Sequence, residues 1–251
     1  MNLILLESGE VQADGAVRLH ADRARHIQNV LHAGPGETLR VGLVDGPQGV
    51  AVVRETGPEG VLLHCTFQDD MPECPRVDLA LAMPRPKVMN RLWPVLASLG
   101  VGRIFILNAW KTERSYFDTH VLDPGHFRRG LLAGLQQAKD TRLPLVSIHR
   151  RFRPWMEDEL PALGAYALKW LAHPGAEGHP LPDALRLPPP GRVLLAIGPE
   201  GGWTSFEQEL FWQQGFAPFS WGERPLRTDT ACTVLLGLIH AGLAAATKPS
   251  A

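Results

Sequence analysis

The sequence is poor in cysteine: its 251 residues include only Cys65, Cys74 and Cys232. Their number is odd, they are widely separated, and none belongs to a CxxC pair. This pattern argues against a disulfide framework and against a structural zinc site, both of which need paired or regularly spaced cysteines. We therefore expect ordinary buried thiols and no bound metal.

Long hydrophobic runs are also missing. The apolar stretch LLGLIHAGLAAA is shorter than the roughly 20 apolar residues that span a bilayer. The opening MNLILLESGE has neither the basic region nor the cleavage site of a secretory signal. Because 45% of the residues are hydrophobic, the composition fits a folded globular protein. We expect a cytoplasmic protein that does not associate with membranes.

Two common phosphate-binding motifs are absent as well. No glycine-rich segment continues into GK[ST], and no GxGxxG is followed by an acidic residue at the usual distance. A nucleotide or other small-molecule enzyme on an α/β sheet would need such a loop. That class of function is therefore disfavoured.

Charge is unevenly distributed along the chain. The net charge of -1 argues against a nucleic-acid partner, because phosphate contacts dominate the affinity of nucleic-acid-binding proteins. Counted by segment, however, the charge is -6 over residues 1–84, +9 over 85–153 and -4 over 154–251. The basic segment predicts a surface for RNA phosphates, although a solvated helix face gives the same count. Our candidates for phosphate binding are Arg85, Lys87, Arg91, Lys111, Arg114, Lys139 and Arg142.

The hydrophobic pattern divides the chain in two. Residues 1–67 alternate short apolar runs with Gly- and Pro-containing turns, which predicts a small β-barrel or sandwich with one helix over 21–31. The polar segment 68–76 carries two prolines and marks a boundary. Beyond it, apolar strands alternate with amphipathic helices. We predict two domains, 1–70 and 76–251, the second a mostly parallel α/β sheet covered by helices on both faces.

A glycine-rich turn follows the buried strand at 192–197. The segment Gly198-Pro199-Glu200-Gly201-Gly202 lies between this strand and a helix whose start is indicated by the capping-box spacing of Thr204 and Glu207. Ligands of open α/β sheets bind at the carboxyl ends of strands, and glycines let backbone groups approach them. The alternative is a tight turn that binds nothing.

A second turn, WGERPLRTDTA (221–231), connects the next strand to the last helix. Arg227 lies just before that helix, where the helix dipole disfavours a cation unless an anionic partner lies nearby.

At these two turns the sequence resembles the RsmE family, the ribosomal RNA small-subunit methyltransferases that modify N3 of a uridine. The family pattern is IGPEGG, a short helix, and then LGxRxLRTETA. This chain has IGPEGGW followed by WGERPLRTDTA. The resemblance is strong over 192–231 and extends loosely over nearly the whole chain, including HIQNVLHAGPGETLRVGLVDG near the N-terminus.

The resemblance implies a knotted SPOUT methyltransferase domain that dimerises through its knot, preceded by a PUA-like β-barrel that binds RNA. Its substrate would be ribosomal RNA or the small ribosomal subunit, and its cofactor S-adenosylmethionine. The cofactor residues it implies are Leu171, His173, Ile197, Gly198, Pro199, Gly201, Gly202, Trp221, Gly222, Pro225, Leu226 and Arg227.

Methyl transfer to a uracil nitrogen needs that nitrogen to lose its proton. Arg227 is our candidate for stabilising charge on the uracil carbonyls. Glu200 or Asp229 would take the proton. As an alternative, Glu200 only holds the loop by accepting backbone N–H bonds.

Several charged positions of the family differ in this chain. His32 replaces an arginine, Ser98 and Gln136 replace acids, and Asp140 replaces an arginine. An arginine close to the N-terminus is missing too. These changes motivate a second hypothesis, an RNA- or ribosome-binding protein without methyl transfer, although the intact GPEGG and LRTDTA segments argue against it.

Overall fold

The computed structural model describes residues 3–173 and 191–246. The chain forms two compact units. The N-terminal unit comprises Met1–Cys74 and Leu132–Leu143, and the C-terminal unit comprises Pro75–Leu131 and Pro144–Ala251. The sequence predicted a single domain boundary at 70–76. It did not predict that residues 132–143 pack with the N-terminal unit.

The N-terminal unit contains a five-stranded mixed sheet. Its strand order is β1-β3-β4-β5-β2, with β1 parallel to β3 and the other neighbours antiparallel. The alternating pattern buries one set of side chains, including Leu19, Val41, Val53 and Leu63, against Ile27 of α1. The elements are β1 (Ile4–Leu6), η1 (Ser8–Glu10), β2 (Ala16–Leu19), α1 (Ala21–Asn29), β3 (Thr38–Leu43), β4 (Gln48–Gly57) and β5 (Gly60–Phe67).

Hydrogen bonds fasten residues 136–141 to this sheet. The backbone N–H of Leu3 donates to the carbonyl of Gln136 at 3.0 Å, and that of Asp45 donates to the carbonyl of Thr141 at 2.8 Å. The buried Thr141 hydroxyl donates to the carbonyl of Gly46 at 2.6 Å. These bonds join residues about 90 positions or more apart in sequence, which periodicity cannot reveal.

The C-terminal unit is built on a six-stranded sheet in which every pair is parallel, in the order β11-β9-β10-β6-β7-β8. The two central strands, β6 and β10, are buried along their whole length. The predicted α/β class is confirmed. The strands are β6 (Val77–Ala82), β7 (Val101–Leu107), β8 (Leu145–His149), β9 (Leu168–Ala172), β10 (Val193–Ile197) and β11 (Ala217–Phe219).

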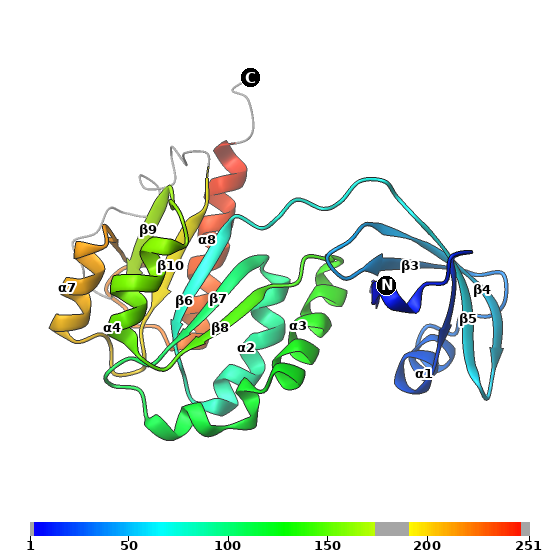
Figure 1. The fold of residues 1–251 in the computed structure, drawn as a ribbon, viewed down its shortest axis with the longest axis horizontal. Helices are drawn as coiled ribbons and strands as arrows, with labels where there is room; N and C mark the ends of the chain where they lie inside the picture. The colour runs from blue at the N-terminus through cyan, green and yellow to red at the C-terminus, as the bar shows by residue number, and fades with distance from the viewer. Residues whose placement is uncertain (1–2, 174–190, 247–251) are drawn as a thin grey trace. The chain divides into compact units, whose positions relative to one another are not determined.

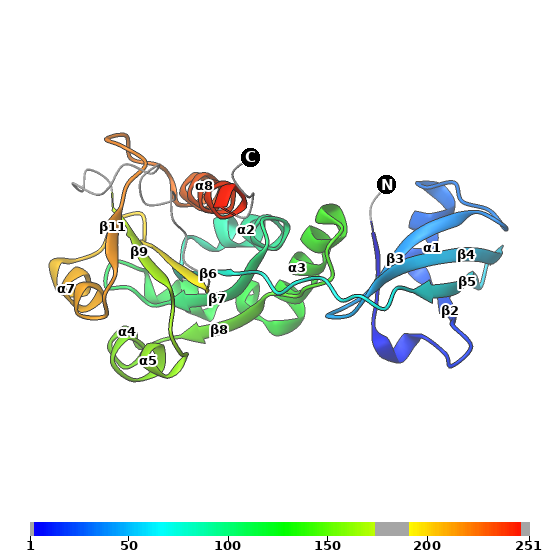
Figure 2. The ribbon, with the colours of Figure 1, turned by 90° about the horizontal axis from the view of Figure 1, so that it is seen from above.

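Helices cover both faces of this sheet, as predicted (Figures 1 and 2). Helices α2 (Pro86–Ser98) and α8 (Thr228–Ala246) pack against each other on one face. The other face is covered by α7 (Ser205–Gln213) and by α4 (Phe152–Pro154), η4 (Trp155–Glu159, a π-helical turn) and α5 (Leu160–Ala162). The remaining elements are η2 (Arg114–Asp118), η3 (His120–Leu122) and α3 (Pro124–Ala138).

The sequence pattern did not predict the helical segment 152–162. Pro154 and Pro161 fall within it, and proline in a helix interior removes a backbone hydrogen bond. The segment is helical because its apolar residues Trp155, Met156 and Leu160 are buried in the core under the sheet.

One expectation about the cysteines is wrong. Cys65 and Cys232 are buried, but Cys74 is exposed because it lies in the polar connecting segment. Burial raises the pKa of the Cys232 thiol to about 12. Within the described residues, no group of three or more His, Cys, Asp or Glu side chains is arranged to hold a metal ion. Nor is any described helix long and apolar enough to cross a membrane.

His240 of α8 makes the stability of the C-terminal unit depend on pH. Burial lowers the pKa of its imidazole. A hydrogen bond to the Leu99 backbone raises the pKa, but by less than burial lowers it. Within the described part of the chain, its Nε2 atom has no hydrogen-bond partner. A lowered pKa means that the unfolded chain binds the proton more readily, so stability present above about pH 6.5 is lost as the pH falls.

We therefore expect the thermal unfolding midpoint to decrease when the pH is lowered from about 7.5 to about 5.5. The decrease should be smaller in His240→Asn. The pKa of His149 is lowered too, chiefly by burial, so the variant should keep part of the dependence. Equal decreases in both proteins would contradict the assignment to His240.

Candidate active site

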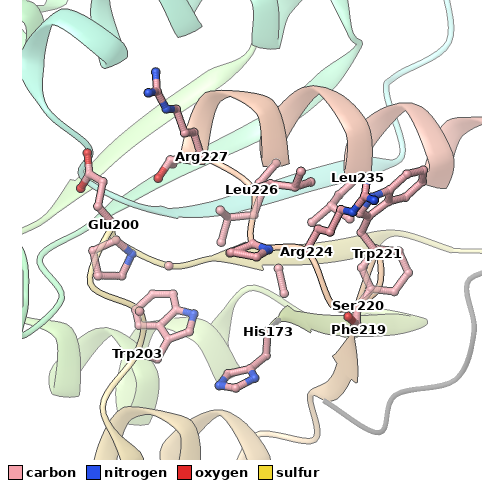
Figure 3. Close-up of a pocket in the computed structure, with 18 of the residues that line it drawn as sticks. His173, Glu200, Trp203, Phe219, Ser220, Trp221, Arg224, Leu226, Arg227 and Leu235 are labelled. Carbon is pink, nitrogen blue, oxygen red and sulfur yellow. The ribbon is translucent and has the colours of Figure 1, made fainter. Parts of the chain in front are cut away.

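A cavity of about 510 Å³ opens at the carboxyl ends of β9, β10 and β11 (Figure 3). It is lined by residues 172–173, 197–203, 219–222 and 224–228, and by Ala231 and Leu235 of α8. The two turns singled out in the sequence therefore line one cavity. Of the predicted cofactor residues, those in the lining are His173, Ile197, Gly198, Pro199, Gly201, Gly202, Trp221, Gly222, Pro225, Leu226 and Arg227.

Leu171 is the predicted cofactor residue that lies outside the lining. Its side chain is fully buried in the core on the face covered by α4, α5 and α7. Successive strand residues point to opposite faces, and it is the next two residues, Ala172 and His173, that reach the cavity at the end of β9.

Several lining residues are not among those that the sequence predicted to bind the cofactor. Trp203 follows the last glycine directly, and Ala231 and Leu235 are four residues apart on α8. This i, i+4 spacing places both on one face of the helix, a signal that could have identified them. The others are Ala172, Glu200, Phe219, Ser220, Arg224 and Thr228.

The walls combine apolar side chains with an indole N–H that has no partner among the described residues. Leu226 lies in the middle of the lining, with Trp203 below it and Leu235 to one side (Figure 3). Trp203 is buried, and among the described residues its Nε1 atom has no hydrogen-bond partner. Pockets for small cofactors combine such apolar walls with a few polar groups that fix orientation.

Gly198 and Gly202 have different reasons to be glycine. A Cβ atom on Gly198 would lie only 3.0 Å from Trp203 Nε1, so the close approach needs a residue without a side chain. Gly202 has a φ of +71°, which residues with a Cβ rarely adopt.

A buried carboxylate supports the glycine turn. Glu207 is only 2% exposed, and its Oε2 accepts hydrogen bonds from the N–H and the hydroxyl of Thr204, both at 2.8 Å. The predicted capping box is thus confirmed. A contact that the sequence analysis did not predict comes from the loop after β7, where the N–H of Trp110 donates to Glu207 Oε1 at 2.7 Å.

Replacing Glu207 with glutamine should destabilise the C-terminal unit. The carboxylate accepts three hydrogen bonds, and the glutamine amide would turn a donor toward one of those N–H or O–H groups. Leaving buried polar groups unsatisfied costs about 1–3 kcal/mol. We expect a decrease of that size in the free energy of unfolding, measured with denaturant. Glu209→Gln, at an exposed position of the same helix, is the matched control and should change little. Equal stability of Glu207→Gln and the wild type would contradict this role.

Glu200 and Arg227 lie at one edge of the cavity, with side chains that point away from Trp203 and His173 (Figure 3). Arg227 is exposed, and its guanidinium makes no hydrogen bond or ion pair within the described residues, whereas its carbonyl accepts the N–H of Ala231 at 2.7 Å. Glu200 accepts a hydrogen bond of 3.4 Å from the backbone N–H of Arg85, at the start of α2. Accepting a backbone N–H in this way agrees with the alternative role of Glu200, in which it only holds the loop in place.

Asp229 lies in the first turn of α8, next to the same edge. Its carboxylate pairs with Arg91 of α2 at 3.3 Å and also accepts the N–H of Thr230 at 3.0 Å. Unlike Glu200, it does not belong to the cavity lining.

The structure brings three of the predicted RNA-binding cations to this edge. Arg85 contacts Glu200 through its backbone N–H, and the guanidinium of Arg91 pairs with Asp229. Lys111 Nζ donates to the carbonyl of Gly201 at 2.7 Å. Lys87 and Arg114 belong to the same unit and are exposed.

The last two predicted cations belong to the N-terminal unit. Lys139 is exposed and lies beyond the end of α3 with a φ of +58°. Arg142 is half-buried, and its Nε donates to the carbonyl of Pro72 at 2.6 Å. Arg142 therefore has a structural role in holding the connecting segment.

Comparisons with known proteins agree with this architecture. A family model described as an RNA methyltransferase domain matches residues 72–240. The ribosomal RNA small subunit methyltransferase E of Treponema pallidum is 31% identical over 249 residues, which cover 96% of this chain and 92% of that protein.

Two solved structures share the fold. A probable rRNA-methyltransferase from Porphyromonas gingivalis has a TM-score of 0.77 at 24% identity, with 98% of this chain and 99% of that chain covered. A ribosomal RNA small subunit methyltransferase E from Neisseria gonorrhoeae, bound to S-adenosyl methionine, has a TM-score of 0.76 at 21% identity, with 96% and 97% covered. On its motifs, its family match and its similarity over nearly its full length, this chain belongs to the ribosomal RNA small subunit methyltransferase E family.

Proposed function

We propose that this chain methylates ribosomal RNA with S-adenosylmethionine as the methyl donor, at N3 of a uridine in the small subunit. The observation that carries the proposal is the single cavity lined by both the GPEGG turn and the LRTDTA turn. The solved relative from Neisseria gonorrhoeae has S-adenosyl methionine bound and a similar fold.

The chain's own groups suit this cofactor. When bound, S-adenosylmethionine supplies an activated methyl group on a sulfonium sulfur. Trp203, Leu226 and Leu235 provide apolar walls for the adenine ring, and backbone groups at the ends of β9, β10 and β11 bind its polar edge. The Trp203 indole N–H, which lacks a partner within the described chain, is available to a ligand acceptor.

The uridine would enter at the edge that carries Glu200 and Arg227. The guanidinium of Arg227 is free to bind the uracil carbonyls and to stabilise the negative charge that develops there when N3 loses its proton. Glu200 is better placed than Asp229 to take that proton, because it lines the cavity whereas Asp229 pairs with Arg91. Holding the reacting atoms in line contributes much of the rate of such a transfer.

The remaining assignments extend this proposal. The C-terminal unit would be a knotted SPOUT domain that forms a homodimer through its knot. The N-terminal unit would be a PUA-like barrel that binds RNA. Arg85, Lys87, Arg91, Lys111 and Arg114 would position RNA through its phosphates, which fix register without reading sequence. A protein acting on ribosomal RNA would work in the cytoplasm.

The binding-protein alternative rests on the altered family positions, and the structure weakens it. Asp140 accepts hydrogen bonds from the N–H groups of Thr141 and Arg142 at 2.6 and 3.0 Å, so it has a structural role of its own. The cofactor cavity, by contrast, keeps both motif turns.

Nucleoside mass spectrometry of ribosomal RNA from a strain that lacks the protein tests the proposal. We expect one methyluridine of the small subunit to disappear and to return when purified protein and S-adenosylmethionine are added to the subunits. An unchanged modification profile would favour RNA binding without methyl transfer.

A further inference from the structure

Trp110 has an exposed indole in the loop after β7, in which Ala109 and Thr112 are buried. The side chain is 84% exposed, whereas neighbouring Ala109 is 2% exposed and Thr112 is 8% exposed. Burying such a large apolar surface contributes a few kcal/mol. An indole left in water on a loop that has two buried residues is therefore a candidate for contact with a ligand.

The backbone that carries this indole is fixed to the glycine turn. The N–H of Trp110 donates to the buried carboxylate of Glu207 at 2.7 Å, and Lys111 Nζ donates to the carbonyl of Gly201 at 2.7 Å. The N–H of Thr112 donates to the carbonyl of Ala109 at 3.0 Å and closes the loop. The indole is thus held on a preordered loop beside the cavity, which lowers the entropic cost of binding.

The surroundings of Trp110 are basic. Lys111 follows it directly, and Arg114 is exposed on η2. Arg85 lies near enough to Tyr116 of η2 to act on its hydroxyl, which donates a hydrogen bond to Glu113 at 3.0 Å, so three cations and one acid surround the segment. Aromatic rings among cations are the usual platform for unpaired nucleotides, because bases stack on the ring while the cations bind phosphates.

We propose that Trp110 stacks against a base of the RNA substrate next to the uridine that is methylated. This inference rests on the proposed function and adds a substrate-binding residue to it. The stacked base is an unpaired nucleotide, since bases within a duplex do not offer a free face.

Fluorescence anisotropy tests the stacking without requiring activity. The probe is a labelled oligouridylate of about 12 nucleotides, within the usual range of single-strand site sizes. We expect Trp110→Ala to weaken binding about 10-fold and Trp110→Phe to restore most of it, because every aromatic ring offers a stacking face. Leu145→Ala, at another exposed apolar position of the C-terminal unit, is the matched control and should bind like the wild type.

Methyl transfer to small subunits that lack the modification provides the second measurement. Trp110→Ala should raise KM for the subunits about 10-fold and leave the Kd for S-adenosylmethionine unchanged. Wild-type protein that transfers no methyl group would contradict the proposed function, and the oligonucleotide measurement would still decide the stacking.

Three results would overturn the inference. One is wild-type affinity of Trp110→Ala for the oligouridylate, and another is failure of the wild type to bind it. The third is a smaller molar mass of Trp110→Ala by light scattering, because the indole would then lie between two copies of the chain.

Discussion

Gly198→Val is expected to weaken binding of S-adenosylmethionine by about 100-fold, which corresponds to about 3 kcal/mol. A Cβ at this position already lies 3.0 Å from Trp203 Nε1 and 3.2 Å from Trp203 Cδ1, and the two methyl groups of valine would extend further. Trp203 is buried against Phe152 and Phe211, so it has little room to retreat. Isothermal titration calorimetry measures the effect.

A matched control variant and an unfolding measurement distinguish a blocked cavity from a misfolded protein. Gly125→Ala places a methyl group at an exposed helical position of α3, where the nearest neighbour would lie 3.9 Å away, so binding should be unchanged. Thermal unfolding of Gly198→Val reports whether the cavity variant is folded. A folded Gly198→Val protein with wild-type affinity would show that the cofactor does not use this cavity.

Arg227→Ala should lower kcat by about 100-fold to 1,000-fold, the range for removing a preorganised donor from developing negative charge. The guanidinium makes no ion pair within the described residues, so its loss leaves no protein group unpaired and should not change stability. The Kd for S-adenosylmethionine should change little, because the side chain points away from Trp203 and His173. Single-turnover methylation of unmodified small subunits measures the effect.

Two further variants test the role of the fork-shaped guanidinium. Arg227→Lys keeps the charge but not the paired donors, so its rate should lie between those of the wild type and Arg227→Ala. Arg153→Ala removes an exposed arginine from the opposite face of the sheet and should leave the rate unchanged. Arg227→Ala could instead raise the KM for RNA and leave kcat unchanged. Arg227 would then bind the ground state and the transition state equally well, which would contradict its role in stabilising the transition state.

The sequence predicts the elements of this fold better than their packing. The strand at 192–197 and the helix started by Thr204 follow from an unbroken apolar run and from cap chemistry, both local properties of the chain. The attachment of residues 132–143 to the N-terminal unit depends on hydrogen bonds such as that of Thr141 to Gly46, which are not local.

The candidate site shows the same division. The two glycine-containing turns are visible as motifs, and the parallel sheet brings them together because both follow the carboxyl ends of strands. The contacts of Lys111 with Gly201 and of Trp110 with Glu207 join segments about 90 residues apart, so no sequence spacing indicates them. Leu171 was assigned to the cofactor through the resemblance, whereas the alternation of side chains along β9 places it in the core.

The most direct test of the account is a crystal structure of the protein with S-adenosylhomocysteine, the product of the donor. The account predicts the ligand between the turns 198–202 and 224–228, with adenine against Leu226 and the sulfur facing the edge at Glu200 and Arg227. A ligand bound elsewhere, or a cavity that stays empty at saturating ligand, would contradict it.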